Sequence, residues 1–185
     1  HFFRNFETMP TLERLALDQC TGKILDVGAG AGCHSRYLLE KGLSVHAIDI
    51  SAGAVAHLRA CGITAEQKTI FDLKDPAYDT ILLLMNGIGL AGSMDQLPVY
   101  LQQLKKLLSP GGKILCDSTD IAYLFAEEDG SFLLNLNDRY YGEMQFNMHY
   151  GDQETGWFSW LYIDFDNLSE QASRQGLTCT LIAEG

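Results

Sequence analysis

The chain has 185 residues, of which 46% are hydrophobic and 20% charged, and its formal net charge at pH 7 is −11. This composition is typical of one soluble globular domain, and so acidic a chain with scattered Lys and Arg is a poor partner for nucleic acid or an anionic membrane. The five cysteines are far apart and form no Cys-x-x-Cys pair, which argues against a disulfide framework and a metal site and favours a reducing cytoplasm.

The N-terminal segment, residues 1–9, is rich in aromatic side chains and begins abruptly at His1, so we expect residues to be missing upstream. The aromatic side chains are expected to pack on the domain. No apolar run approaches the about 18 residues of a membrane span, and no signal peptide is visible. From Pro10 to Gly22 the spacing of Leu12, Leu15 and Ala16 predicts a helix.

A glycine-rich loop follows the first predicted strand. The apolar run Ile24–Val27 leads directly into Gly28, Gly30 and Gly32, and a helix is predicted over 33–41. Such a loop allows positive φ and close approach of a ligand, and the start of the helix offers unpaired N–H groups. The dinucleotide fingerprint would need its third glycine at position 33, which is Cys33, so the spacing disfavours a nicotinamide cofactor.

The run Asp26-Val27-Gly28-Ala29-Gly30-Ala31-Gly32 resembles the first motif of the class I S-adenosylmethionine-dependent methyltransferases. The family often closes a lid over the cofactor, which is an alternative role for residues 1–9. A second strand, predicted over 43–48, ends at Asp49, where both nucleotide-binding families place a carboxylate for the ribose hydroxyls. Ser51 can cap the next helix, over 52–61, and leave Asp49 free for that role.

The next two predicted strands carry the remaining cofactor residues. The strand over 63–68 is less apolar and is predicted at the sheet edge, and the resemblance implies that Phe71 packs on the adenine while Asp72 faces its amino group. An exposed turn aspartate is the alternative. The strand over 80–85 is the most apolar and is predicted to be central, beside the first strand. It ends at Asn86, whose amide could hold the cofactor's amino group or the acceptor, unless it is only a turn residue.

A leucine-rich helix over 97–108, a turn at 109–112 and a strand over 113–117 resemble the next segment of the family, so residues 22–118 are expected to form the cofactor-binding core. The predicted fold is α/β, a doubly wound Rossmann-like, mostly parallel sheet with helices on both faces. The resemblance implies the cofactor S-adenosyl-L-methionine, with contacts from Asp26, Gly28, Ala29, Gly30, Asp49, Ile50, Phe71, Asp72, Asn86 and Gly87.

Near the C-terminus, alternating patterns over 140–150 and 157–164 predict an inserted antiparallel β-hairpin, joined by a turn-rich loop. We expect residues 139–164 to cap a substrate pocket, unless the aromatic residues only form core. A helix is predicted to open with a capping box at Asn167, and a strand over 177–183 follows it. The family's sheet needs one more, antiparallel strand after this one, so we expect either that residues are missing after Gly185 or that the sheet is shortened. The aromatic pocket residues would be Tyr141, Tyr150, Trp157 and Trp160.

The predicted function is methyl transfer to a small molecule by in-line displacement, carried out by a single domain over 1–185. A general base is optional, and His149 is the first candidate, with His34, Asp117 and Asp120 as alternatives. Two rival hypotheses are a noncatalytic binding module that uses the nucleoside-binding fold and, disfavoured by Cys33, an NAD-dependent oxidoreductase.

Overall fold

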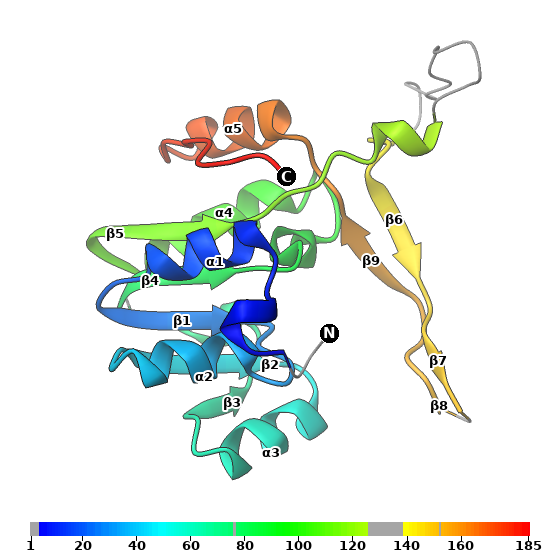
Figure 1. Cartoon of the computed structure of the whole chain (residues 1–185). Helices are drawn as coiled ribbons and strands as arrows, with labels where there is room; N and C mark the ends of the chain where they lie inside the picture. Colours follow the sequence, from blue (N-terminus) through cyan, green and yellow to red (C-terminus); the bar gives the residue numbers. More distant parts are fainter. Residues whose placement is uncertain (1–3, 76, 126–138, 152) are drawn as a thin grey trace. The chain divides into compact units, whose positions relative to one another are not determined.

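The computed structural model describes residues 4–75, 77–125, 139–151 and 153–185 (Figure 1). The chain divides into two compact units. The first contains residues 1–87, 103–117 and 183–185, and the second contains residues 88–102 and 118–182. The single domain expected over 1–185 stays a prediction.

The first unit is built on a five-stranded parallel sheet with the strand order β3-β2-β1-β4-β5. The chain adds β2 and β3 on one side of β1 and then β4 and β5 on the other side. This strand order is that of a doubly wound Rossmann-like sheet and confirms the predicted fold class. The strands are β1 (Lys23–Val27), β2 (Ser44–Asp49), β3 (Ala65–Gln67), β4 (Tyr78–Leu83) and β5 (Leu108–Cys116).

Apolar content along the strands explains their places in the sheet. In β4 every residue except Asp79 is buried, as a central parallel strand covered on both faces requires. It pairs with β1 in the register Leu25↔Ile81 and with β5 in the register Leu82↔Leu115. The short and more polar β3 lies at the sheet edge, as predicted.

Helices α1 (Thr11–Asp18) and α2 (Cys33–Glu40) lie in front of the sheet in Figure 1, and α3 (Ala52–Ala60) packs near β3. Leu17 of α1 and Leu38 of α2 are fully buried with Ile24 and Leu82 in one cluster, each worth about 1.5–3 kcal/mol of transfer free energy. The predicted apolar face of α1 is partly wrong, because Leu15 is 39% exposed. The buried face instead contains Glu13 and Leu17.

Two short 3-10 helices flank these elements, η1 (Phe6–Thr8) and η2 (Ile70–Asp72). The ring of Phe6 stacks on that of Tyr37 in α2 at 4.0 Å, so this aromatic side chain packs on the domain as expected. Phe2 and Phe3 lie outside the described residues. No helix in the described ranges has the length and apolar character needed to cross a membrane.

The turn predicted at 109–112 lies within β5, which follows α4 (Leu97–Leu107) directly. The strand accommodates the extra residues by a register shift, with Tyr78 opposite Leu108 and Thr80 opposite Lys113. Glycine is needed in this irregular stretch, since a Cβ at Gly112 would lie 2.9 Å from the Tyr78 carbonyl oxygen. The helix therefore ends within one residue of its predicted end, while the strand begins at Leu108 and includes the residues predicted as a turn.

The second unit carries the predicted hairpin in two shorter pieces. Strands β6 (Glu143–Phe146) and β9 (Phe158–Leu161) pair antiparallel, and β7 (His149–Tyr150) pairs with β8 (Gln153–Glu154). Next to the β7–β8 pairs, the Thr155 amide donates to the Met148 carbonyl and the Met148 amide donates to the Thr155 hydroxyl, both at 3.0 Å. The unit also contains the 3-10 helix η4 (Ala122–Phe125) and most of η3 (Gly87–Ala91).

Two predictions near the C-terminus are wrong. The helix α5 (Phe165–Arg174) is capped by Asp164 rather than by a capping box at Asn167, because Asp164 has extended backbone and its carboxylate accepts hydrogen bonds from the Asn167 backbone at 2.9 Å and side chain at 2.7 Å. Residues 177–183 form no regular strand. Leu181 and Ile182 are about half exposed, so no buried face fixes a register there.

Candidate functional site

The glycine loop between β1 and α2 adopts the backbone geometry predicted for a ligand cradle. Gly28, Gly30 and Gly32 all have positive φ, at 69°, 56° and 78°. The amides of Gly28 and Ala29 both donate to the Ile48 carbonyl, which fixes the loop beside the end of β2. Gly32 is the N-cap of α2, so the loop delivers the chain directly into a helix N-terminus.

Asp26, at the end of β1, holds this loop from beneath. Its side chain is buried, and its Oδ2 accepts a 2.6 Å hydrogen bond from the Ser35 hydroxyl in the first turn of α2. Burial raises the pKa of Asp26, while the charge of His34 and the Ser35 hydrogen bond act in the opposite direction. Asp26 therefore ties the strand before the loop to the helix after it.

Asp49, at the end of β2, is fixed by the backbone on both of its oxygens. Oδ2 accepts from the Gly30 amide at 2.9 Å, and Oδ1 accepts from the Ser51 amide at 2.8 Å. Ser51 caps α3 through the Ala54 amide, so the cap that was predicted to leave Asp49 available is confirmed. A carboxylate with its orientation set in this way suits recognition of a diol, since each oxygen can accept further hydrogen bonds.

Two large apolar side chains are exposed after β2 and β3. Ile50, directly after β2, is 69% exposed, and Phe71, in η2 after β3, is 54% exposed. Asp72, next to Phe71, accepts hydrogen bonds from the Thr69 backbone and hydroxyl at 2.8 Å, and these bonds lower its pKa. Asp72 thus forms a capping box at η2, so the turn role weighed against the adenine contact is present here.

The turn after β4 is strained. Met85 and Asn86 have φ of 61° and 57°, a conformation that costs about 1–3 kcal/mol for each such residue. The Asn86 amide donates a 2.8 Å hydrogen bond to Oδ1 of Asp117, which follows β5, and the Asn86 side chain is buried. Burial raises the pKa of Asp117, against the hydrogen bond from Asn86.

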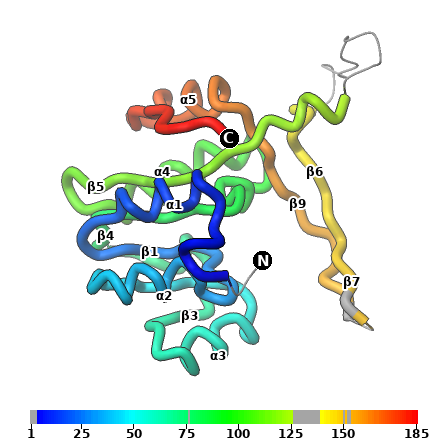
Figure 2. Tube along the Cα trace, in the orientation of Figure 1, coloured from blue at the N-terminus to red at the C-terminus, as the bar shows by residue number. Residues whose placement is uncertain are grey.

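A buried ion cluster joins the N-terminal segment to the first turn of α2. Arg4 Nη2 lies 2.6 Å from both carboxylate oxygens of Glu13, and His34 Nε2 lies 2.7 Å from Glu13 Oε2. Burial alone would lower the pKa of His34, but a hydrogen bond with Cys33 and the charge of Asp26 raise it to about 9. The trace in Figure 2 shows the N-terminal segment that carries η1 beside α2. His34 is therefore a poor general base, because it is occupied and protonated at neutral pH.

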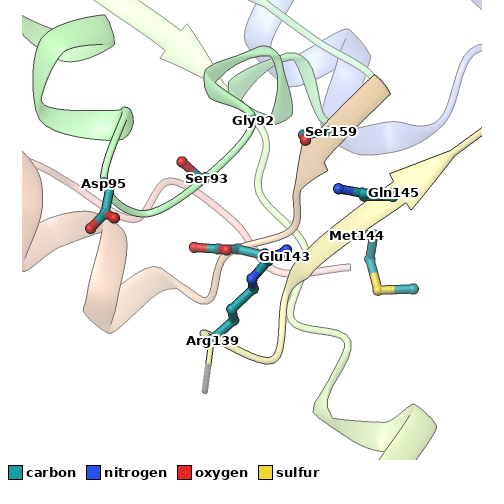
Figure 3. A pocket seen from close by; sticks show the side chains of 8 residues that line it. All are labelled: Gly92, Ser93, Asp95, Arg139, Glu143, Met144, Gln145 and Ser159. Atoms are coloured by element: carbon teal, nitrogen blue, oxygen red, sulfur yellow. The ribbon is translucent and has the colours of Figure 1, made fainter. Parts of the chain in front are cut away.

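In the second unit, a polar hollow of about 340 Å³ lies beside β6 and β9. Figure 3 shows side chains reaching it from both strands and from the segment after η3. Glu143 is held in place because its Oε1 accepts a 2.9 Å hydrogen bond from the Met94 amide. The hollow is lined by Gly92, Ser93, Asp95, Arg139, Glu143, Met144, Gln145 and Ser159.

None of the four aromatic residues predicted for a substrate pocket lines this hollow. The Tyr141 hydroxyl donates to Asp120 at 2.7 Å, and the Trp160 indole packs so closely on Gly89 that a Cβ there would lie 2.2 Å from its Nε1. Trp157 is 73% exposed, and the Tyr150 side chain lies outside the described part of the chain. In β9, Trp160 alternates with Ser159, which faces the hollow, so pleating accounts for the absence of Trp160 from the lining.

The candidate bases of the second unit have partners. His149 is exposed, and its Nε2 lies 3.9 Å from Glu154 on the adjacent strand. Asp120 accepts hydrogen bonds from the Ala122 amide and the Tyr141 hydroxyl. The role of His149 as a base stays a prediction.

The chain matches the family described as a methyltransferase domain over residues 3–182, and no curated protein compared with it matches. A SAM-dependent methyltransferase from Bacteroides fragilis, solved in complex with S-adenosyl-L-homocysteine, is 47% identical with a TM-score of 0.92, over 100% of this chain and 75% of that one.

More distant structures share the fold. The 1,6-didemethyltoxoflavin-N1-methyltransferase of Burkholderia thailandensis is 17% identical with a TM-score of 0.59, over 93% of this chain and 70% of that one. A sugar N-methyltransferase from a Streptoalloteichus species is 15% identical with a TM-score of 0.61, over 95% of this chain and 79% of that one.

Proposed function

The chain belongs to the S-adenosylmethionine-dependent methyltransferases, and on that premise we propose that it transfers the cofactor's methyl group to a polar small molecule by in-line displacement. When bound, S-adenosylmethionine supplies a methyl group on a sulfonium that is already primed to leave. The chain's own residues then have to bind the cofactor, align the acceptor and exclude water. Alignment alone is worth several kcal/mol when the reacting atoms are held at about 3–3.5 Å.

The observation that carries the proposal is the carboxylate of Asp49, fixed against the glycine loop by the amides of Gly30 and Ser51. We propose that Asp49 accepts hydrogen bonds from the two ribose hydroxyls, while the loop and the N-terminus of α2 hold the methionine part. The exposed Ile50 and Phe71 would sandwich the adenine, an arrangement that explains why such apolar side chains face solvent without the cofactor.

The cofactor set thus keeps the residues predicted from the sequence, with different tasks for some of them. Asp26 acts through Ser35 on the shape of the loop. Asp72 is committed to its capping box by Oδ2, and an adenine contact would use its other oxygen. Asn86 and Gly87 lie beyond the end of β4, where ligands bind in doubly wound sheets.

For the acceptor we propose a molecule with amino or hydroxyl groups, bound in the polar hollow of the second unit. Asp95 and Glu143 offer carboxylates, and Ser93, Gln145 and Ser159 offer further hydrogen-bonding groups. Methyltransferases of the same fold act on a heterocycle and on a sugar, which is consistent with a small acceptor. The net charge of −11 supports a small molecule rather than nucleic acid, and we expect the enzyme to work in the cytoplasm.

The first test is titration calorimetry with S-adenosylmethionine, S-adenosylhomocysteine and NAD in parallel, on the purified chain. We expect micromolar binding of the two adenosyl ligands and none of NAD. Polar amines and hydroxy compounds would then be screened for release of S-adenosylhomocysteine, with Glu143→Gln as the variant that should weaken the acceptor without changing cofactor affinity. A folded protein that binds neither adenosyl ligand would contradict the proposal and favour a noncatalytic binding module.

A further inference from the structure

The turn after β4 is held in an unusual conformation at two successive positions. Met85 and Asn86 are the non-glycine residues with positive φ among the residues that the structure describes. Glycine would adopt this conformation without strain, and the nearest glycine, Gly87, comes too late in the chain to relieve either residue. Asn tolerates the left-handed region better than most residues, but Met does not, so local preference alone does not explain this turn.

Asp117 supplies the contact that explains the turn. Its Oδ1 lies 2.8 Å from the Asn86 amide nitrogen, and its own amide donates to the Leu83 carbonyl at 3.4 Å. Leu83 pairs with Cys116 in the parallel ladder, so Asp117 continues the β4–β5 pairing by one residue. The sheet therefore fixes the position of the Asp117 carboxylate, which accepts a hydrogen bond from the backbone just after the end of β4.

The hydrogen bond from the Asn86 backbone amide to Asp117 fixes the turn that carries the Asn86 side chain. Asn86 is only 8% exposed, so its side-chain amide is largely shielded from bulk water. The strained turn and the buried Asn86 side chain are both held by the Asp117 carboxylate. Such an arrangement is typical of a preorganised binding group.

We propose that Asp117 is a positioning residue of the methyl-transfer site. Through the Asn86 backbone it holds the left-handed turn at Met85 and Asn86, and the turn in this conformation presents the side-chain amide of Asn86 to the bound cofactor. This inference rests on the proposed function, in which Asn86 contacts the cofactor. Asp117 itself need not touch the cofactor, since its Oδ1 is bonded to the Asn86 backbone. Its role is distinct from that of a general base.

The experiment measures the dissociation constant of S-adenosylhomocysteine by titration calorimetry for the wild type and three variants. Asp117→Ala should weaken binding about tenfold or more, because a hydrogen bond to a charged group is lost and the turn is released. Asp117→Asn keeps a carbonyl acceptor and should stay within about threefold of the wild type. Adding Met85→Gly to Asp117→Ala should recover part of the loss, since glycine accepts positive φ without the carboxylate.

The matched control is Asp79→Ala, at the start of β4, the strand whose other end leads into Met85 and Asn86. Asp79 Oδ2 also accepts a backbone amide, that of Lys23, at 2.8 Å. This variant should lower the unfolding temperature and leave the affinity for S-adenosylhomocysteine unchanged. A double-mutant cycle with Asn86→Ala completes the design. If both substitutions act through the side-chain amide of Asn86, the effects of Asn86→Ala and Asp117→Ala on the binding free energy of S-adenosylhomocysteine should be strongly non-additive.

Each outcome decides the inference. Wild-type affinity in Asp117→Ala, equal losses in Asp117→Ala and Asp117→Asn, or additive effects in the cycle would overturn it. If Asp117→Ala does not fold, Asp117→Glu, which displaces the carboxylate by one methylene, takes its place with the same expected loss. A wild-type protein that binds no S-adenosylhomocysteine would refute the proposed function instead, and would do so before any variant is compared.

Discussion

Replacing Asp49 by Asn tests the cofactor assignment at its most specific point. The substitution preserves the volume of the side chain but removes its charge and one of its two acceptor oxygens. In the structure, each oxygen already accepts one backbone amide, from Gly30 and from Ser51. The remaining acceptor capacity is what the ribose hydroxyls would use, so the variant loses charge assistance on both ribose bonds.

The expected magnitude follows from the number of bonds affected. A hydrogen bond to a charged group is worth about 1.5–3 kcal/mol, so weakening two of them should cost about 3 kcal/mol, or roughly 100-fold in affinity. The assay is titration calorimetry with S-adenosylhomocysteine and with its 2′-deoxy analogue. The wild type should prefer the ribose form strongly, and Asp49→Asn should lose most of that preference.

Ser51→Ala is the control, since it removes the hydroxyl that caps α3 but keeps the backbone amide that Asp49 accepts. This variant should be less stable and bind S-adenosylhomocysteine as the wild type does. If Asp49→Asn retains the wild-type discrimination between the two ligands, Asp49 does not bind the ribose and the assignment is wrong.

Three further predictions concern groups around the loop and the hairpin. Ser35→Ala leaves the buried Asp26 carboxyl without its 2.6 Å donor and should lower the free energy of unfolding by about 1–3 kcal/mol, measured by urea titration; an unchanged midpoint would contradict this. Because the pKa of His34 is raised from 6.5 to about 9, its contribution to stability should be complete below pH 6.5 and lost as the pH rises through about 9; Glu13→Gln should reduce that loss in urea unfolding across this range. His149→Ala should leave the affinity for S-adenosylhomocysteine within about twofold, because the side chain is exposed, and a larger change would place it at the cofactor.

The parallel sheet was predictable because its signals are local and strong. The apolar run 80–85 indicated a central buried strand, which the structure has over 78–83, and the helix cap at Ser51 lies where it was predicted. The C-terminal part was harder. Asp164 and Asn167 are both good capping residues, and only tertiary contacts, such as the Tyr140 hydroxyl on Asp164, select between them.

The residues of the glycine loop and Asp49 were predictable because they belong to one local motif. Contacts between segments that lie far apart in the sequence were not predictable. The bonds from Asp49 to the loop follow from the order of strand, loop and strand. The Arg4–Glu13–His34 cluster joins three segments, and its one signal was Glu13 on the same helix face as the buried Leu17, four residues on. The Asp117 contact with Asn86 depends on the order of strands in the sheet, which a single sequence states only indirectly.

The packing of Trp160 on Gly89 gives this protein an intrinsic optical probe. The sequence has two tryptophans, and they differ in surroundings: Trp157 is 73% exposed, while the Trp160 indole lies against the backbone of η3, which begins directly after Asn86. Acrylamide should therefore quench the emission of Trp157 first. In a Trp157→Phe variant, the fluorescence of Trp160 alone would report on the segment after Asn86, and its change on adding S-adenosylhomocysteine could be followed in a stopped-flow instrument without any label.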